Sequence, residues 1–294
     1  HGMDLFVETP IAANVDAALR MDQLFGSRGL VLGVSETWRY RPQMRYARWV
    51  VDNSLSFREN GGVRETPHLG APQIILHDDA ASAWAPNRIV ADTPWRHRRA
   101  ECGGIALDSA IHLFHYVAHI AGAIEWVQGT AETVARIRYT RDAAGQVLRE
   151  VACDADDTCF ASFNTERGIL GNLAASWARG AGITSASGPE IHASNGSIVG
   201  DLFHRDGAAT VALGEHFAAT ATPAEHARRF PLGLTDPYAL AQYEWLAAIR
   251  ERRAPETGTR EGLHDLACVL ALIESSARGE RIRVADILSK ASQG

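Results

Sequence analysis

Two kinds of secondary-structure signal follow one another along this 294-residue chain, and their order limits the folds that it can adopt. In the first part, short apolar runs at residues 5–7 and 30–34 predict buried strands, and each is followed by a helix signal. Asn14 is a good N-cap for a helix through about Ser27, and Pro42 opens a second helix. This alternation of strands and helices is typical of a parallel sheet.

From residue 124 to about 211 the signals are mainly those of strands, with one earlier strand expected at residues 73–77. Residues 133–139 alternate, residues 158–164 and 168–177 flank a turn, and residues 190–193 and 197–199 flank Asn195-Gly196, a strong hairpin signal. Such a succession predicts an antiparallel sheet. The chain ends in helices that we expect to begin at Asp236-Pro237 and at a Thr259 cap, the last of them reaching Arg278.

The composition excludes several classes of partner. A formal charge of -6 argues against nucleic acid as the main partner. No apolar run approaches the ~20 residues that a membrane-spanning helix needs, and residues 1–7 lack the flanks of a signal peptide. The four cysteines show no CxxC pair and no zinc-site spacing. We therefore expect a cytoplasmic protein with no membrane partner and no bound metal.

Residues 103–122 combine a helix signal with a stripe of ionisable groups. Asp108, His112, His115 and His119 repeat at spacings of four, three and four, which places them along one face of an α-helix. A carboxylate one turn before a histidine can orient the imidazole for proton transfer, although a core helix carrying buried histidines is the alternative. The four groups span ~16 Å, too far to converge on one metal ion.

Five short motifs, in this order, resemble the glucose-fructose oxidoreductase, inositol dehydrogenase and MocA (Gfo/Idh/MocA) family over nearly the whole chain. They are Glu8-Thr9-Pro10, residues 37–42 (TWRYRP), Gly103-Gly104 with Asp108 and His112, the 194–197 hairpin, and Pro255-Glu256-Thr257.

The resemblance implies an α/β protein with two domains. Residues 1–67 would be the C-terminal part of a Rossmann domain, and residues 68–294 an α+β substrate and oligomerisation domain with an open, mainly antiparallel sheet, against which the C-terminal helices pack back. The implied activity is hydride transfer between NAD or NADP and a sugar, inositol or related polyol. The implied partner is a second copy of the chain bound through the open sheet.

The resemblance also implies site residues. The family's catalytic set is the lysine of Glu-Lys-Pro with an aspartate and a histidine four residues apart, which correspond here to Thr9, Asp108 and His112. Glu8, Pro10 and Arg39 are expected at the cofactor, with a salt bridge between the domains as the alternative for Arg39. Further substrate contacts are expected from Trp95, His115 and Tyr40, with packing as the alternative for Tyr40; we expect His119 to be structural.

Two departures from the family pattern affect activity. The chain contains no GxGxxG loop to cradle a pyrophosphate, so we expect an N-terminally truncated member with weak or absent NAD(P) binding. Thr9 replaces the charged lysine with a neutral hydroxyl. His112 could still act as a general base oriented by Asp108, but activity would be reduced or lost. The alternative is a non-catalytic member that senses a ligand or binds a protein.

Overall fold

The computed structural model describes residues 2–55, 69–79, 93–178 and 188–291. Strand β1 (Leu5–Glu8) and strand β2 (Leu32–Ser35) pair in parallel, which confirms the predicted parallel arrangement. Helix α1 (Val15–Ser27) joins them, and the Asn14 side chain caps it by accepting a hydrogen bond from the Ala17 amide at 2.9 Å. The 3₁₀ helix η1 (Thr37–Tyr40) and helix α2 (Pro42–Leu55) follow β2.

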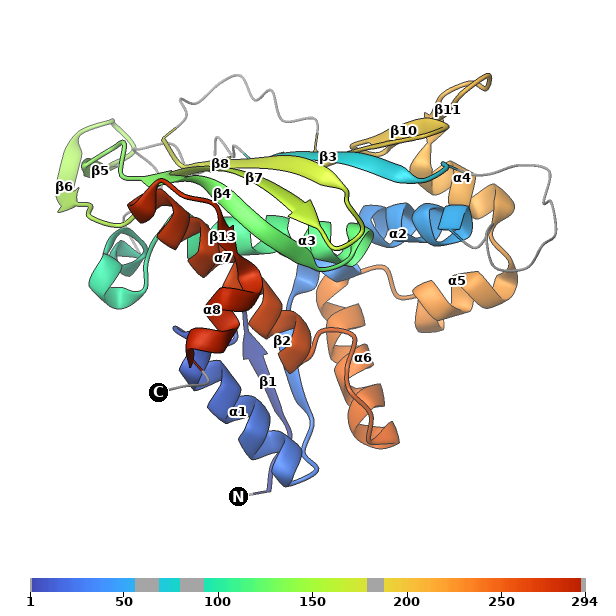
Figure 1. Ribbon diagram of the computed structural model, residues 1–294, viewed down its shortest axis with the longest axis horizontal. Helices are drawn as coiled ribbons and strands as arrows, with labels where there is room; N and C mark the ends of the chain where they lie inside the picture. The colour runs from blue at the N-terminus through green and yellow to red at the C-terminus, as the bar shows by residue number, and fades with distance from the viewer. Residues whose placement is uncertain (1, 56–68, 80–92, 179–187, 292–294) are drawn as a thin grey trace.

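A nine-stranded sheet dominates the rest of the described chain (Figure 1). Its neighbours are antiparallel except for β3 and β8, which confirms the expected open and mainly antiparallel sheet. In spatial order the strands are β12 (Val211–Ala212), β11 (Leu202–Arg205), β10 (Gly196–Val199), β9 (Glu190–Ala193), β3 (Pro72–Asp79), β8 (Leu170–Ser176), β7 (Thr158–Thr165), β4 (Ile124–Glu132) and β13 (Ile282–Arg283).

A separate hairpin corrects one predicted strand. Instead of a strand over residues 133–139, β4 ends at Glu132 and β5 (Ile137–Arg141) begins a two-stranded sheet with β6 (Val147–Ala152). The buried Asp157 carboxylate accepts hydrogen bonds from the amides of Val134 and Ala135 at 2.9 and 2.8 Å. These bonds hold a turn where the alternating sequence predicted a strand.

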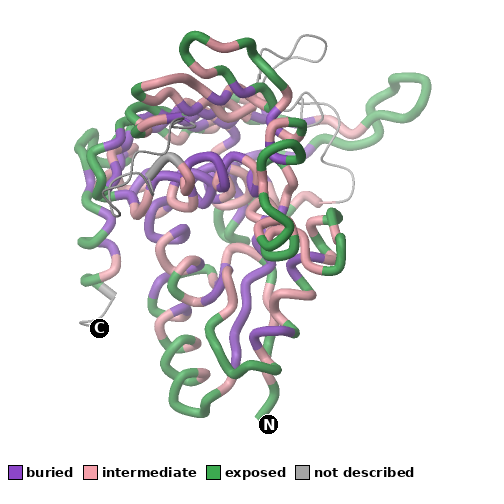
Figure 2. The backbone as a smooth tube through the Cα atoms, turned by 90° about the vertical axis from the view of Figure 1, so that its right-hand side faces the viewer, coloured by how far each residue is buried: buried purple, intermediate pink, exposed green. Residues whose placement is uncertain are grey.

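Helices cover one face of the nine-stranded sheet (Figure 1). Helix α3 (Ile111–Ala121) and helix α7 (Thr259–Arg278) pack against each other, and α7 packs along β4. Most residues of α3 are buried, and in Figure 2 the buried backbone lies mainly in the sheet and in the layer of helices beneath it. The remaining helices are η4 (Pro94–His97), η5 (Arg99–Glu101), α4 (Leu213–Thr220), α5 (Pro223–Arg229), η7 (Pro231–Gly233), α6 (Pro237–Glu251) and α8 (Val284–Ala291).

Two helix predictions need correction. Gly258, not Thr259, caps α7; its amide donates to the Glu261 carboxylate, and Thr259 is the first helical residue. The stripe through residues 103–122 is not one continuous α-helix, because residues 106–110 form a π-helical turn (η6, Ala106–Ala110) before α3. The Ile111 amide donates to the Ala106 carbonyl five residues back. Asp108 therefore lies in the π-helical turn, and the three histidines lie in the α-helix that follows it.

Candidate active site

The first part of the site is the edge at which β1 and β2 both end. Because the strands are parallel and Glu8 pairs with Ser35, Thr9 and Glu36 leave the sheet at the same edge. The carboxyl ends of parallel strands are where open α/β sheets place their ligands. Glu8 is exposed, and Thr9 and Pro10 are partly exposed across a cis peptide bond.

Gly103 and Gly104 let the chain turn tightly before α3. A Cβ on Gly103 would lie 2.4 Å from the Trp95 carbonyl oxygen. Gly104 adopts a φ of +126°, and a Cβ there would lie 2.5 Å from an Asp156 carboxylate oxygen. That same carboxylate accepts a hydrogen bond from the Ala106 amide at 2.8 Å. The glycines therefore let Asp156 hold the start of the helical segment that carries the candidate catalytic histidine.

His112 and Glu36 form the central pair of the site. Nδ1 of His112, in the first turn of α3, lies 2.7 Å from the Glu36 carboxylate. The Glu36 side chain is 1% exposed and that of His112 is 20% exposed. The other Glu36 oxygen accepts a hydrogen bond from the Trp38 amide at 3.0 Å, so the carboxylate is fixed by its own η1 helix. With Nδ1 on the carboxylate, Nε2 is the ring nitrogen that remains for a ligand.

Charge and burial act in opposite directions on this pair. Burial lowers the pKa of His112, but the Glu36 carboxylate, its hydrogen bond and, to a smaller extent, the Asp108 charge raise it more, so the pKa lies above its ordinary value. Burial raises the pKa of Glu36, but the charge and hydrogen bond of His112 hold it below its usual value. Both shifts favour an ion pair, whose imidazolium can release a proton to a reacting carbonyl. After that proton has left, the neutral imidazole can take one from a hydroxyl.

Aromatic and cationic groups build the wall beside His112. The Trp38 ring stacks on the imidazole, with ring centroids 5.4 Å apart and planes 2° from parallel. The Arg41 guanidinium lies 4.0 Å from the centroid of the same indole. His77 of β3 packs against Trp38 at 5.8 Å and is buried. This packing fixes the orientation of the catalytic candidate.

Asp108 does not orient His112 as we expected. Its carboxylate pairs with the Arg96 guanidinium at 3.1 Å, whereas Glu36 accepts the hydrogen bond at His112 Nδ1. Asp108 lies in the π-helical turn, where the spacing of four residues no longer has the meaning that it has in a continuous α-helix. Asp108 acts on His112 through charge alone.

Two of the other predicted contacts have structural partners. Tyr40 is 1% exposed, and its hydroxyl lies 3.3 Å from the Thr257 hydroxyl, which is the packing arrangement weighed as its alternative. Trp95 is exposed, and the Arg96 guanidinium lies 4.5 Å from the centroid of its ring.

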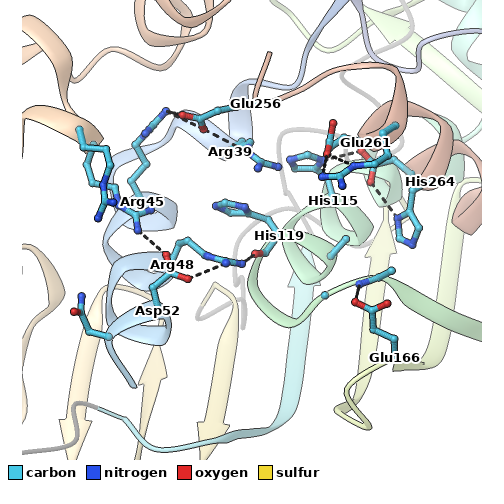
Figure 3. A pocket seen from close by; sticks show the side chains of 18 of the residues that line it. Arg39, Arg45, Arg48, Asp52, His115, His119, Glu166, Glu256, Glu261 and His264 are labelled. Atoms are coloured by element: carbon cyan, nitrogen blue, oxygen red, sulfur yellow. Dashed lines mark hydrogen bonds and ion pairs between the residues drawn. The ribbon is translucent and has the colours of Figure 1, made fainter. Parts of the chain in front are cut away.

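Arg39 forms a salt bridge, the alternative considered for it. Its Nε lies 3.5 Å from the Glu256 carboxylate, in the loop before α7. It also lines a cavity of about 810 Å³ (Figure 3). Arg39 shares this cavity with His115, Ala118 and His119 of α3, whereas Trp38 and His112 do not line it.

His115 and His119 lie further along α3 than His112. His115 Nδ1 is 2.7 Å from the buried Asp265 carboxylate of α7, and the His115 side chain is 2% exposed. His119, seven residues after His112, is ~10 Å further along the helix axis. Both line the cavity of Figure 3, and His112 does not. The histidines of this stripe therefore belong to two different places: His112 to the edge of β1 and β2, and His115 and His119 to the cavity.

The sequence reasoning missed Glu36, Trp38 and Asp265. Glu36 sits directly after a buried strand, a position that signals a ligand-facing loop. Its partner, however, is 76 positions away, and Asp265 is 150 positions from His115. No local pattern joins residues at such separations.

Among the residues that the structure describes, no three or more His, Cys, Asp or Glu side chains are grouped so as to hold a metal ion. None of the described helices is both long and apolar enough to span a membrane.

Comparison with known proteins gives one family match. Residues 76–199 match the model of the GFO/IDH/MocA C-terminal domain. The chain is 24% identical over 291 residues to the uncharacterized protein YMR315W of Saccharomyces cerevisiae, covering 96% of this chain and 73% of that protein. It is 25% identical over 186 residues to D-xylose dehydrogenase of Paenarthrobacter nicotinovorans, covering 60% of this chain and 42% of that enzyme.

Solved structures share the fold. A levoglucosan dehydrogenase in complex with NADH and levoglucosan superposes with a TM-score of 0.72 at 17% identity, covering 96% of this chain and 74% of that one. An NAD binding oxidoreductase from Klebsiella pneumoniae superposes with a TM-score of 0.73 at 17% identity and the same coverage.

Proposed function

We propose that the chain, whose residues 76–199 match the model of the GFO/IDH/MocA C-terminal domain, acts as an oxidoreductase on a sugar, inositol or related polyol. The observation that carries the proposal is the His112–Glu36 pair at the edge where β1 and β2 end. The relatives named as dehydrogenases of D-xylose and levoglucosan support a sugar or polyol as substrate. We assign residues 1–67 to cofactor binding and residues 68–294 to the substrate.

The cofactor that fits this proposal is NAD or NADP. Thr9 and Pro10 at the open edge of the two-stranded sheet, together with Glu8, would meet the nicotinamide end. The sequence has no GxGxxG loop for the phosphates, and for this reason we propose weak binding by this chain. When bound, the cofactor supplies the hydride acceptor or donor.

His112 moves the proton in this proposal. In the oxidation direction, its Nε2 takes the proton of the substrate hydroxyl while Glu36 balances the positive charge that develops on the ring. In the reduction direction, the imidazolium returns a proton to the carbonyl oxygen. Trp38, stacked on the ring, holds the imidazole plane and gives a sugar an apolar face to lie on.

Thr9 motivates the alternative function, a ligand-sensing or protein-binding member without catalysis. A lysine at this position would bring an ammonium to the substrate oxygen, and the threonine hydroxyl brings no charge. One variant at this position separates the hypotheses. Thr9→Lys should raise turnover if the site is catalytic and merely weakened.

The direct test is an assay of turnover with D-xylose, levoglucosan and a panel of polyols. The change in nicotinamide absorbance at millimolar NAD or NADP measures the rate. We expect slow turnover that His112→Asn lowers by ~10²–10⁴-fold. Trp126→Phe is the control, because Trp126 lies on β4, packed by Arg281 and remote from His112. Binding of a sugar without turnover by either the native chain or Thr9→Lys would favour the sensing alternative.

We also propose that the open face of the sheet binds a second copy of the chain. Ile74, Phe160 and Leu170 are each 45–55% exposed and follow the residue alternation onto the face opposite α3 and α7. Phe160→Lys should shift a dimer toward the monomer in sedimentation velocity, whereas the exposed Leu246→Lys on α6 should not.

A further inference from the structure

A second polar cavity lies beside the C-terminal half of α3. It has a volume of about 810 Å³, and its walls come from η1, α2, α3, α5, the loop before α7 and the start of α7. Neither His112 nor Glu36 lines it. Figure 3 shows Arg39, His119 and Arg48 projecting into this space. The cavity is large enough for a small metabolite.

Four guanidinium groups on its walls share two carboxylates. Arg39 and Arg45 both pair with Glu256, and Arg48 and Arg229 both pair with Asp52. The two contacts to Asp52 are short, at 2.8 and 2.7 Å, but those to Glu256 are 3.5 and 3.4 Å. A charge-assisted hydrogen bond of this kind is ~2.7–2.9 Å long. Arg39 and Arg45 are therefore under-satisfied.

Buried nitrogen atoms confirm that these groups have unused donors. The Arg45 side chain is 6% exposed, and its Nε has no hydrogen-bond partner among the described residues. The same holds for Nε of Arg229 and for Nε of Arg39, which has only its 3.5 Å ion pair with Glu256. A buried polar group without a partner destabilises the folded state, and a bound ligand that supplies the partner removes this cost. Three such atoms in the wall of one cavity indicate a missing acceptor.

The other acidic groups of the lining are already engaged. Asp265 holds His115, Glu261 pairs with Arg260 at 2.7 Å, and Glu225 accepts from the Trp49 indole at 2.9 Å. Burial, followed by the charges of Arg39 and Arg48, lowers the pKa of His119 well below its ordinary value, which keeps this ring neutral at neutral pH. The lining as a whole, Glu166 included, holds six arginines and six carboxylates. On the wall formed by Arg39, Arg45, Arg48 and Arg229, however, only Asp52 and Glu256 pair with the four guanidinium groups, so this wall carries a local positive excess.

From this arrangement we propose that the cavity is a second binding site, for a small hydroxylated metabolite bearing a phosphate monoester or a carboxylate. The oxyanion binds between Arg39, Arg45 and Arg48, where it supplies the acceptor that Glu256 supplies only at long range. The neutral His119 ring meets the hydroxyl groups. Binding here does not require His112.

The test is isothermal titration of the whole chain with inorganic phosphate, glycerol 3-phosphate and gluconate, each without cofactor. We expect saturable binding of at least one, and its identity separates a phosphate monoester from a carboxylate as the source of the oxyanion. Arg39→Gln and Arg48→Gln should each weaken binding at least tenfold. Arg250→Gln is the matched control, because Arg250 is an exposed arginine outside the cavity.

A second variant guards against misfolding of the arginine variants. Ala118→Leu fills the cavity from α3 without removing a charge and should abolish binding while the melting temperature stays within a few degrees. His112→Asn should leave binding unchanged, which separates this site from the proposed catalytic one. No saturable binding by any of the three probes, or equal binding by Arg39→Gln, Ala118→Leu and Arg250→Gln, would overturn the proposal.

Discussion

Helix α3 carries two histidine–carboxylate pairs of the same length that differ in their access to solvent. His112 and His115 each place Nδ1 2.7 Å from a carboxylate, Glu36 in one case and Asp265 in the other. The His112 side chain is partly exposed beside the edge of β1 and β2, whereas His115 and Asp265 are both buried between α3 and α7. The same kind of histidine–carboxylate hydrogen bond can therefore orient an accessible imidazole for proton transfer in one place and join two helices in another.

Replacing each histidine in turn gives the largest expected effect and tests whether the two pairs differ in role. His115→Asn leaves the buried Asp265 charge without its close partner, and we expect a loss of about 3–5 kcal/mol in the free energy of unfolding. His112→Asn should cost much less stability, because its site is partly exposed. Urea unfolding of both variants measures this difference. Equal stability losses would show that the pairs do not differ in role.

A second prediction concerns the carboxylate that orients His112. Glu36→Gln removes the charge that raises the pKa of His112 and leaves the burial that lowers it, so the inflection of kcat against pH should move to lower pH. Turnover should fall on the order of 10²-fold, because the fixed tautomer is lost. A pH–rate profile with an unmoved inflection would contradict the assignment of Glu36.

The two ends of the histidine stripe should respond oppositely to pH. The pKa of His112 is raised in the folded state, so its pair stabilises the fold below pH ~6.5, and this contribution disappears as the pH rises through the folded pKa. The pKa of His119 is lowered, so the unfolded chain binds a proton more readily and stability falls as the pH drops below ~6.5.

Melting temperatures measured between pH 5 and 8 test these opposite pH dependences of stability. His119→Asn should lessen the acid sensitivity of the native chain. The melting temperature of His112→Asn should differ most from that of the native chain at low pH. The same pH dependence of the melting temperature in both variants would contradict the prediction that the two histidines act in opposite directions.

The smallest effect is expected at Asp108. Its charge is a minor contribution to the raised pKa of His112, and its hydrogen bond goes to Arg96. Asp108→Asn should therefore change kcat only several-fold, far less than Glu36→Gln. A loss as large as that of Glu36→Gln, measured in the same assay, would restore Asp108 as the orienting carboxylate.

Much of the fold was predictable because its signals are local. The Asn14 cap, the Pro42 helix start, the Asn195-Gly196 hairpin and the strands around residue 167 all appear where the sequence places them. The failures also have local causes. A buried Asp157 held a turn within an alternating segment, and a π-helical turn interrupted a stripe that sequence spacing reads as one helix.

The amino-acid sequence alone was enough to predict the order of the elements, the place of His112 within a helical segment, and the family resemblance from which its role is proposed. Only the tertiary structure decided which carboxylate holds each histidine, since Glu36 and Asp265 reach α3 from distant parts of the chain. Periodicity reports which residues share a face of one helix. Burial and charge pairing depend on which other elements pack against that face, and these set the difference between a proton donor, a structural pair and the wall of a cavity.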